Sequence, residues 1–579
     1  MSKRQRPCDL CRSRKTACRI DQAPPCRLCV LHGRECTFVE AAVPRKRPHL
    51  LDGLGVHDGV TTQSLSLQSE QANSPNSMNV LPSLIGETTP GDTTMNFAGD
   101  FNFDTTQSEF EAMFRSPRLP STPSVAGTPE TSIRKAAVQS PKIDYLTGAN
   151  PQLLGLSSDM DPILLRSYRY DEEGMFGFKE LAISSVQDRP MPCQFLISQQ
   201  SLFSRSREEA GLGKLLEAEL KRELEKIVPI EVGKRLIILF LKFINPQWPI
   251  FSLSQSLDIY STPSHTLAAV YALSLPFAIH DDKLSVDVAY DKPPYPALSN
   301  IIEKAVTYEI HSPSMFLIQI LLLLVLRPSL DPLVGDAAYR WDLLSRLTSC
   351  AATLGLHLDP STWPLEVWQK AQRRRLSFFI YTLDKWLACG LGRPPLIHND
   401  NWIVTSLEPE DFDDSSLEWT QINILSATVN RLGQLYVQLI ILRAELRTSL
   451  PDHDGDSLSS HVQTLRKSLK DCLAALSDII RTLSPDTDSV FWPPWAQYAF
   501  SSVCFTLMTM VVTSPNVEEA SSWISELQST RKSLRLKVAS FPFLRLGLLR
   551  IDAIFWRGIS SVLHLEPHVS DAFQAMELT

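Results

Sequence analysis

The 579-residue sequence lacks any apolar run long enough to cross a lipid bilayer. Its longest run, residues 315–326, spans about 12 residues and includes Gln319, so it fits a buried core helix better. The basic residues at the start of the chain have no apolar segment behind them, and no secretory signal is predicted. We therefore expect a soluble, intracellular protein that does not enter a membrane.

The familiar motifs of catalysis are also missing. The chain contains no G-x-G-x-x-G, no P-loop, no nucleophile elbow and no H-E-x-x-H. His357 and His398 have no second metal ligand or base at a meaningful spacing, so we interpret them as ordinary histidines. No repeat of fixed period is present, which argues against a solenoid. The sequence does not indicate an enzyme.

Charge is distributed unevenly. Residues 1–50 hold twelve Lys and Arg against four Asp and Glu, a net charge of +8, so the remainder of the chain carries −16. A basic head on an acidic body favours nucleic-acid binding by the head, because Lys and Arg replace the counterions condensed on phosphate. A basic tail that serves only for targeting is the alternative.

Cysteines are concentrated in the same segment. Six of the eleven lie between Cys8 and Cys36, in a chain that we expect to occupy a reducing compartment, so metal binding is favoured over disulfides. The other five are interpreted as small buried apolar residues: Cys193, Cys350, Cys389, Cys472 and Cys504.

The spacing of the six clustered cysteines repeats once. Two C-x2-C-x6-C halves follow each other, made up of Cys8, Cys11 and Cys18, then Cys26, Cys29 and Cys36. A C-x2-C pair places two thiolates within reach of one tetrahedral zinc. Two separate four-thiolate sites would need eight cysteines, so six suffice for two zinc ions only if two thiolates bridge them. So small a module has almost no apolar core, and metal binding would supply its folding free energy.

These residues resemble the fungal zinc binuclear cluster (Zn2Cys6) transcription factors. The resemblance covers the six cysteines, the basic stretch Arg12-Ser-Arg14-Lys15 and the proline-bearing loop Pro24-Pro25. It implies that Cys8 and Cys26 bridge both metals. It further implies that Cys11 and Cys18 complete one site, and Cys29 and Cys36 the other.

The resemblance also implies how double-stranded DNA is contacted. Lys15 would read guanines in the major groove, typically in a CGG triplet, through O6 and N7. Four arginines would mostly meet phosphate: Arg12, Arg14, Arg19 and Arg27. Each of the four could instead be a solvated surface charge.

The chain departs from the family pattern in two places. Ala17 stands where many members carry a basic residue before the third cysteine. Residues 41–70 contain Pro44, Pro48 and three glycines without a sustained heptad pattern, which argues against the coiled coil that pairs many members on a palindromic site.

A polar linker follows the cysteine cluster. The basic stretch Arg45-Lys46-Arg47 is a candidate nuclear localisation signal, and residues 51–145 are rich in Ser, Thr, Pro, Gly and Asn, which predicts a disordered segment. Within it, residues 92–114 hold five acidic residues, no basic ones and seven spaced Phe and Met residues. This composition is typical of an acidic activation segment, although it could also be unremarkable linker.

Residues 146–579 show helical periodicity and no set of short alternating strands, so we predict an all-α fold for this body. Helices are predicted over residues 213–228, 232–243, 266–279, 298–310, 314–326, 339–356, 365–391, 422–446, 458–483, 495–512, 517–538 and 544–563.

The body resembles the fungal-specific regulatory domain, or middle homology region, of the same family. Three stretches carry the resemblance: Asn245-Pro-Gln-Trp-Pro-Ile-Phe251, the segment from Cys350 to Asp359, and the segment from Arg373 to Pro395. Residues 168–173 and the Arg-Pro-Cys-Asp opening resemble a subgroup that includes regulators of nitrogen-source utilisation. Arg373, Arg374 and Arg375 begin an amphipathic stretch, and we expect them to bind carboxylates or loop carbonyls rather than DNA.

The sequence supports three hypotheses. The first is a nuclear, sequence-specific regulator of RNA polymerase II genes that binds two zinc ions and contacts the transcription machinery or co-regulators. The second is a co-regulator that acts through its body and linker with little direct reading of DNA. The third is an enzyme or a sensor of a small-molecule effector, with a pocket in the helical body.

Overall fold

The computed structural model describes two units of the chain, within residues 1–99 and 100–579. In the first it describes residues 8–9, 11, 18, 20, 24–31 and 36–38. In the second it describes residues 143–577 except 147, 190, 253–256, 291, 330, 332–334, 413–426, 450–459 and 486–490. The candidate activation segment 92–114 and the basic stretch Arg45-Lys46-Arg47 lie outside the described residues.

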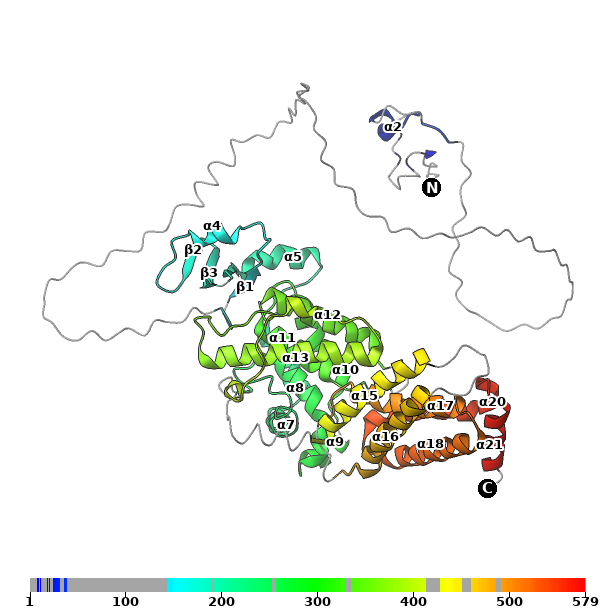
Figure 1. The fold of residues 1–579 in the computed structure, drawn as a ribbon. Coiled ribbons are helices and arrows are strands. Elements are labelled where there is room, and N and C mark those ends of the chain that lie inside the picture. The colour runs from blue at the N-terminus through cyan, green and yellow to red at the C-terminus, as the bar shows by residue number, and fades with distance from the viewer. Residues whose placement is uncertain are drawn as a thin grey trace, which may run out of the picture. The chain divides into compact units, whose positions relative to one another are not determined.

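Helices dominate the second unit, as predicted (Figure 1). The first group of helices comprises α6 (Glu217–Ile227), α7 (Ile230–Phe243), α8 (Ser264–Ser274), α9 (Leu284–Tyr290), α10 (Tyr295–Glu309), α11 (Met315–Leu326), α12 (Ala337–Thr353) and α13 (Val367–Leu391). The second comprises α15 (Ala427–Ser449), α16 (Ser460–Thr482), α17 (Ala496–Val512), α18 (Val517–Lys537), α19 (Arg545–Arg557), α20 (Ile559–Val562) and α21 (Pro567–Glu577). Each predicted helical segment contains a helix.

Helix α11 lies at the centre of the first group, against α8, α12 and α13. Eleven of its twelve residues are buried, because the apolar run has no polar face to present to water. Ser314 caps its N-terminus by accepting a hydrogen bond from the Leu317 amide at 3.1 Å. The run that was too short for a membrane is therefore a core helix, and none of the described helices is long and apolar enough to span one.

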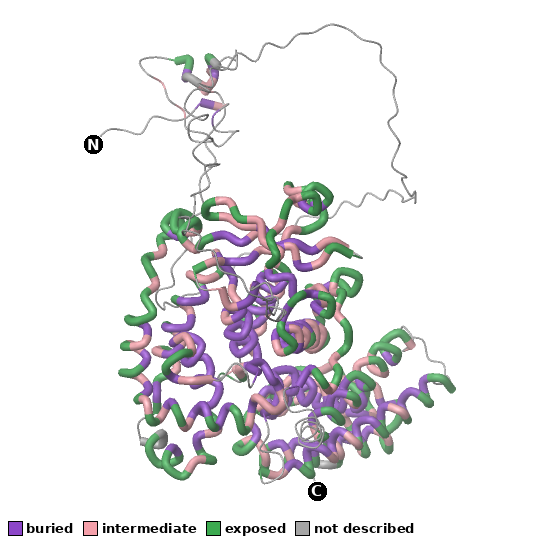
Figure 2. The backbone as a smooth tube through the Cα atoms, turned by 90° about the vertical axis from the view of Figure 1, so that its left-hand side faces the viewer, coloured by how far each residue is buried: buried purple, intermediate pink, exposed green. Residues whose placement is uncertain are grey.

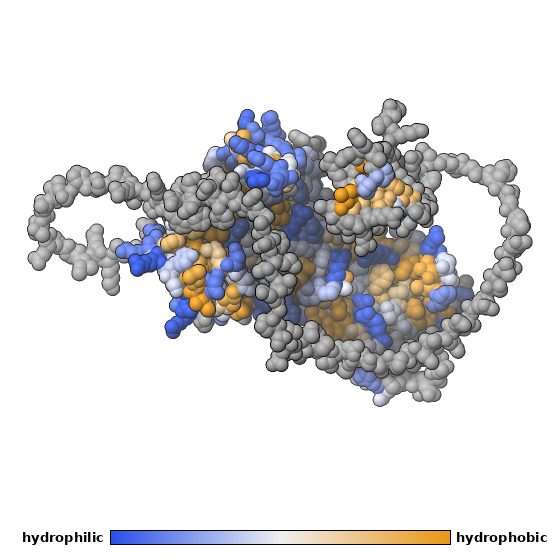
Figure 3. Space-filling model, turned by 90° about the horizontal axis from the view of Figure 1, so that it is seen from above, coloured by the Kyte–Doolittle hydropathy of each residue, from blue (hydrophilic) through white to orange (hydrophobic). Residues whose placement is uncertain are grey.

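The second group is built around α17, which contacts α15, α16, α18 and α19. One continuous hydrophobic core runs from α6 to α21 and joins the two groups through α13 and α17. Figure 2 shows the buried residues along the inward sides of these helices. Seen from above, hydrophobic residues also reach the surface between hydrophilic ones (Figure 3).

A four-stranded antiparallel sheet precedes the helices. Its strands are β1 (Ala149–Leu154), β2 (Met175–Phe178), β3 (Leu181–Gln187) and β4 (Cys193–Gln199), in the order β1-β4-β3-β2. Short helices α4 (Pro162–Arg166) and α5 (Ser204–Glu209) and the 3₁₀ turn η1 (Gln200–Phe203) flank it. The prediction of a body helical throughout was therefore wrong for residues 149–199. Six of the seven residues of β4 are not exposed, so this strand has no alternation of apolar and polar residues that the sequence could reveal.

The sheet has its own small core. Ile143, Val186, Phe195 and Trp363 are buried together, and the rings of Phe195 and Trp363 meet edge to face with centroids 5.6 Å apart. Because Trp363 precedes α13 in the chain, this core attaches the sheet to the helical body.

Helices α17 and α19 approach closely at Gly547. A methyl group there would come within 3.0 Å of the Ser501 Cα. We expect Gly547→Ala to lower the free energy of unfolding by about 1–3 kcal/mol, because the clash involves backbone that cannot rotate away. Denaturant titration monitored by circular dichroism measures this, with Ser522→Ala on the exposed side of α18 as control. A higher free energy of unfolding in Gly547→Ala would show that α17 and α19 can move apart without cost.

Candidate functional site

The six clustered cysteines come together in the first unit. Cys8, Cys11, Cys26 and Cys29 are fully buried, and Cys18 and Cys36 are partly buried. Their sulfurs form two groups of four within 4.8 Å, and both groups contain Cys8 and Cys26. Cys11 and Cys18 complete one group, and Cys29 and Cys36 the other.

The two halves of the cluster are arranged alike. The Cys8 amide donates to the Cys18 Sγ at 3.4 Å, and the Cys26 amide donates to the Cys36 Sγ at the same distance. In each half the first cysteine therefore holds the third through its backbone. The short helix α2 (Arg27–Leu31) follows Cys26, and Asp9 and Cys11 have helical backbone after Cys8. The repeated spacing in the sequence thus corresponds to a repeated local structure.

Sulfur–sulfur distances fit a metal and not a disulfide. Cys8 Sγ lies 3.7 Å from the sulfurs of Cys26 and Cys29, and Cys11 Sγ lies 3.6 Å from that of Cys26. A disulfide would bring two sulfurs to about 2.05 Å. Four thiolates at about 2.3 Å from a tetrahedral zinc would be about 3.8 Å apart. The cluster has the dimensions of two tetrahedra that share an edge.

The pKa values separate the two cysteines shared by both groups, Cys8 and Cys26, from the other four. A hydrogen bond from the Cys29 amide lowers the pKa of Cys26 to about 6. Burial opposes ionisation of Cys8, but hydrogen bonds led by that from the Cys11 amide lower its pKa. Burial and the neighbouring thiols raise the pKa of Cys11 to about 12. The remaining thiol pKa values are also raised: those of Cys18, Cys29 and Cys36. A bound cation is what would let all six ionise together.

Most of the predicted DNA contacts lie outside the described residues. These are Arg12, Arg14, Lys15 and Arg19. Arg27 is described only by its backbone, as the first residue of α2. Within the part of the chain that the structure describes, His, Cys, Asp and Glu ligand atoms gather in the geometry of a metal site only at the cysteine cluster.

Arg373, Arg374 and Arg375 near the start of α13 form a polar centre in the body. Arg373 is 1% exposed, and its Nε and Nη2 donate to the two oxygens of the buried Asp144 at 2.8 and 2.6 Å. Its Nη1 donates to the Leu354 carbonyl at 2.9 Å. The guanidinium also lies 4.9 Å from the Trp363 ring. The prediction of a disordered segment over residues 51–145 is therefore wrong for residues 143–145, which Arg373 joins to α13.

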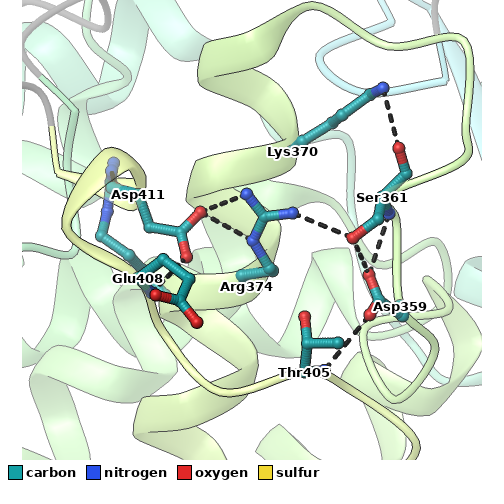
Figure 4. Close-up of polar contacts among 8 residues, drawn as sticks. Asp359, Ser361, Lys370, Arg374, Thr405, Glu408 and Asp411 are labelled. Atoms are coloured by element: carbon teal, nitrogen blue, oxygen red, sulfur yellow. Dashed lines mark hydrogen bonds and ion pairs between the residues drawn. The ribbon is translucent and has the colours of Figure 1, made fainter.

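The other two arginines bind a loop that comes later in the sequence. Arg374 pairs with Asp411, donating from Nε to Oδ1 at 2.6 Å, and also donates to Ser361 (Figure 4). Arg375 donates to the carbonyls of Pro249 and Asp411. Asp411 in turn accepts from the Glu408 amide at 2.9 Å. The prediction that these arginines bind carboxylates and loop carbonyls is confirmed.

Their partners could not be found from the sequence. Asp144 lies 229 residues from Arg373, and nothing near it in the chain marks it as a counter-ion.

The predicted apolar face of α13 is buried as expected: Leu376, Phe379, Ile380, Leu383 and Leu387. Cys389 contradicts its prediction, because it is exposed while the other four scattered cysteines are buried. Adjacent residues on a helix point about 100° apart, so the apolar neighbours of Cys389 face the core without it.

Residues 237–530 match the fungal specific transcription factor domain, which is half of the chain. The chain belongs to this family. It is a family of transcription regulators, not of enzymes. The resemblance drawn from residues 245–251, 350–359 and 373–395 is thereby confirmed for the helical body.

Two curated relatives also regulate transcription. An uncharacterized transcriptional regulatory protein of Schizosaccharomyces pombe is 23% identical over 475 residues, which cover 78% of this chain and 64% of that protein. The transcriptional activator protein DAL81 of Saccharomyces cerevisiae is 30% identical over 187 residues, 31% of this chain and 18% of that protein. The chain thus spans less than two thirds of either relative. No solved structure matches it.

The buried Arg373–Asp144 ion pair can be compared with an exposed one, Arg166–Asp188. We expect Arg373→Ala to lower the free energy of unfolding by about 3–5 kcal/mol, because it leaves a buried carboxylate without a counter-ion. Arg166→Ala removes a partner of Asp188 from an exposed pair and should cost at most about 1 kcal/mol. Denaturant titration of both variants measures the difference. Equal losses would mean that burial does not strengthen the pair.

Proposed function

We propose that the chain is a zinc-dependent, DNA-binding regulator of RNA polymerase II transcription. The observation that carries this is the sharing of Cys8 and Cys26 between two groups of four sulfurs, in a chain that belongs to a transcription-factor family. Six thiolates would hold two zinc ions, with the shared pair bridging them. Folding of a module with so small an apolar core would then depend on the metal.

DNA binding follows from the charge around this cluster. Residues 1–50 carry a net charge of +8, which suits a polyanion. Lys15 would donate to guanine O6 and N7 of a CGG-type triplet, while Arg12, Arg14, Arg19 and Arg27 would meet phosphates and fix the orientation of the module. Arg45, Lys46 and Arg47 would direct the protein to the nucleus.

The other segments would supply regulation. Residues 92–114 would offer acidic and aromatic groups to the transcription machinery or to a co-regulator. The helical body has the family's regulatory domain, and its arginines at α13 are engaged in internal contacts and so are not available to phosphate. DNA contacts would therefore come from the first unit.

The shared cysteines make a prediction about zinc content. We expect wild type to bind two zinc ions per chain, and Cys8→Ser or Cys26→Ser to lose both, because each removes a ligand from both groups. Cys11→Ser should retain more zinc, since it belongs to one group only. Metal analysis of the purified full chain measures this, with the exposed Cys389→Ser as control. Equal losses at positions 8 and 11 would argue against bridging.

Variants at Lys15 and Arg14 would test base reading and phosphate binding separately. We expect Lys15→Met to reduce the preference for CGG-containing over scrambled duplexes by about 1–3 kcal/mol. Arg14→Met should weaken binding to both duplexes alike, because phosphate contacts carry no sequence information. Competition gel shifts at physiological salt measure both. A wild-type protein with equal affinity for the two duplexes would instead support a co-regulator that does not choose its sites.

A further inference from the structure

A cavity of about 750 Å³ lies in the second unit, beside the end of the sheet. Its walls come from η1 and α5, the segment 212–216, the N-terminus of α8, the end of α10 and the start of α11. The volume is within the range of small-molecule sites, roughly 300–1,000 Å³. The cavity residues are far along the chain from the six clustered cysteines, Cys8 to Cys36, and the transcription-factor proposal does not use the cavity.

Arg207 lines this cavity and is 4% exposed. Its Nε donates to the Tyr308 carbonyl, its Nη1 to the Gln200 carbonyl, and its Nη2 to the side chains of Gln200 and Ser312. The guanidinium lies 4.0 Å from the Tyr308 ring centroid. All of these acceptors are neutral, and among the described residues no carboxylate pairs with Arg207.

The buried arginines of the same body are satisfied in two ways: Arg340, like Arg207, donates to a neutral acceptor, the Val325 carbonyl, whereas others have a carboxylate partner. Arg373 pairs with Asp144, and Arg531 pairs with Asp552 at 2.6 Å. Burying a cation without a counter-ion is costly, since neutral acceptors replace only part of its hydration. Arg207 thus carries a charge that a bound anion would compensate.

The acidic residues of the cavity do not perform that role. Glu309 approaches the buried His265 at 2.9 Å and accepts a hydrogen bond from Ser314 at 3.1 Å, so both of its oxygens are engaged. Burial lowers the pKa of His265, but the facing carboxylates of Glu309 and Glu217 outweigh it, so the net shift is upward. Glu208 is exposed. Glu309 is therefore compensated by His265, and Arg207 remains the unbalanced group.

The walls of the cavity favour a ligand with an apolar body. Helices α8 and α11 begin here, but their N-termini already have acceptors: the Ser264 amide donates to Glu217 at 2.7 Å, and the Leu317 amide donates to Ser314. The walls also include apolar side chains, those of Leu212, Leu215, Leu216, Pro263 and Phe316. Inorganic phosphate would leave these walls unoccupied, whereas an organic acid would cover them.

We propose that this cavity binds a small organic anion whose carboxylate pairs with the Arg207 guanidinium and whose apolar part packs on Leu215 and Phe316. The site goes beyond the transcription-factor proposal and would give the regulatory body an effector.

The test uses the full chain with hexanoate and phenylacetate as probes, and with hexanamide and phenylacetamide as uncharged counterparts. Calorimetry at constant ionic strength should show saturable binding of at least one carboxylate and at least tenfold weaker binding of its amide. Arg207→Gln should weaken carboxylate binding at least tenfold, while Arg166→Gln, at an exposed arginine, leaves it unchanged. Carboxylates that bind neither more tightly than their amides nor less tightly to Arg207→Gln would overturn the proposal.

A second variant guards against misfolding of Arg207→Gln. Gly213 lines the cavity, and a Cβ there would meet nothing within 4 Å, so Gly213→Phe should fold normally and weaken binding by filling space. Unchanged carboxylate affinity in folded Gly213→Phe would place the bound anion elsewhere. Cys8→Ser should lose zinc and DNA binding but keep carboxylate binding, so failure of one proposal leaves the other standing.

Discussion

The helical body depends on a row of three consecutive arginines at the beginning of α13. Successive side chains on a helix point about 100° apart, so adjacent arginines reach different parts of the fold. Arg373 reaches Asp144 at the start of the body, Arg374 reaches Asp411, and Arg375 reaches the Pro249 carbonyl. These contacts tie loops to a long helix that already contacts α11, α12 and α17. A single turn of helix thereby fixes segments that are far apart in sequence.

The sequence predicted the helices well because their apolar residues recur with helical period or form unbroken runs. Its boundaries were correct to within a few residues for α7, α11 and α17. The single predicted segment 544–563 is divided into α19 and α20 at Gly558, whose φ of +87° is outside the helical region. The sequence did not reveal the sheet, because β2 is only four residues long and β4 is buried on both faces. Short strands without alternation cannot be told from loops by pattern alone.

Spacing was informative for the cysteines in a way that it was not for the arginines. The six cysteines lie within 29 consecutive residues, so their repeated C-x2-C-x6-C spacing could reveal the cluster from the sequence alone. Counter-ions of buried arginines have no such restriction: 229 residues separate Arg373 from Asp144, and 21 separate Arg531 from Asp552. Long-range polar partners become visible only when the fold is known.

The burial of Asp144 bears on where the folding unit that contains the fungal specific transcription factor domain begins. Residues 237–530 match the family domain, and Arg373 lies inside these bounds while its counter-ion lies outside them. Ile143 and Phe195, which share the small core with Trp363, also lie outside. A fragment of residues 237–530 would expose one side of Trp363 and leave the buried Arg373 guanidinium without its counter-ion. The segment before residue 237 therefore belongs to the same folding unit, although the match to the family begins only after it.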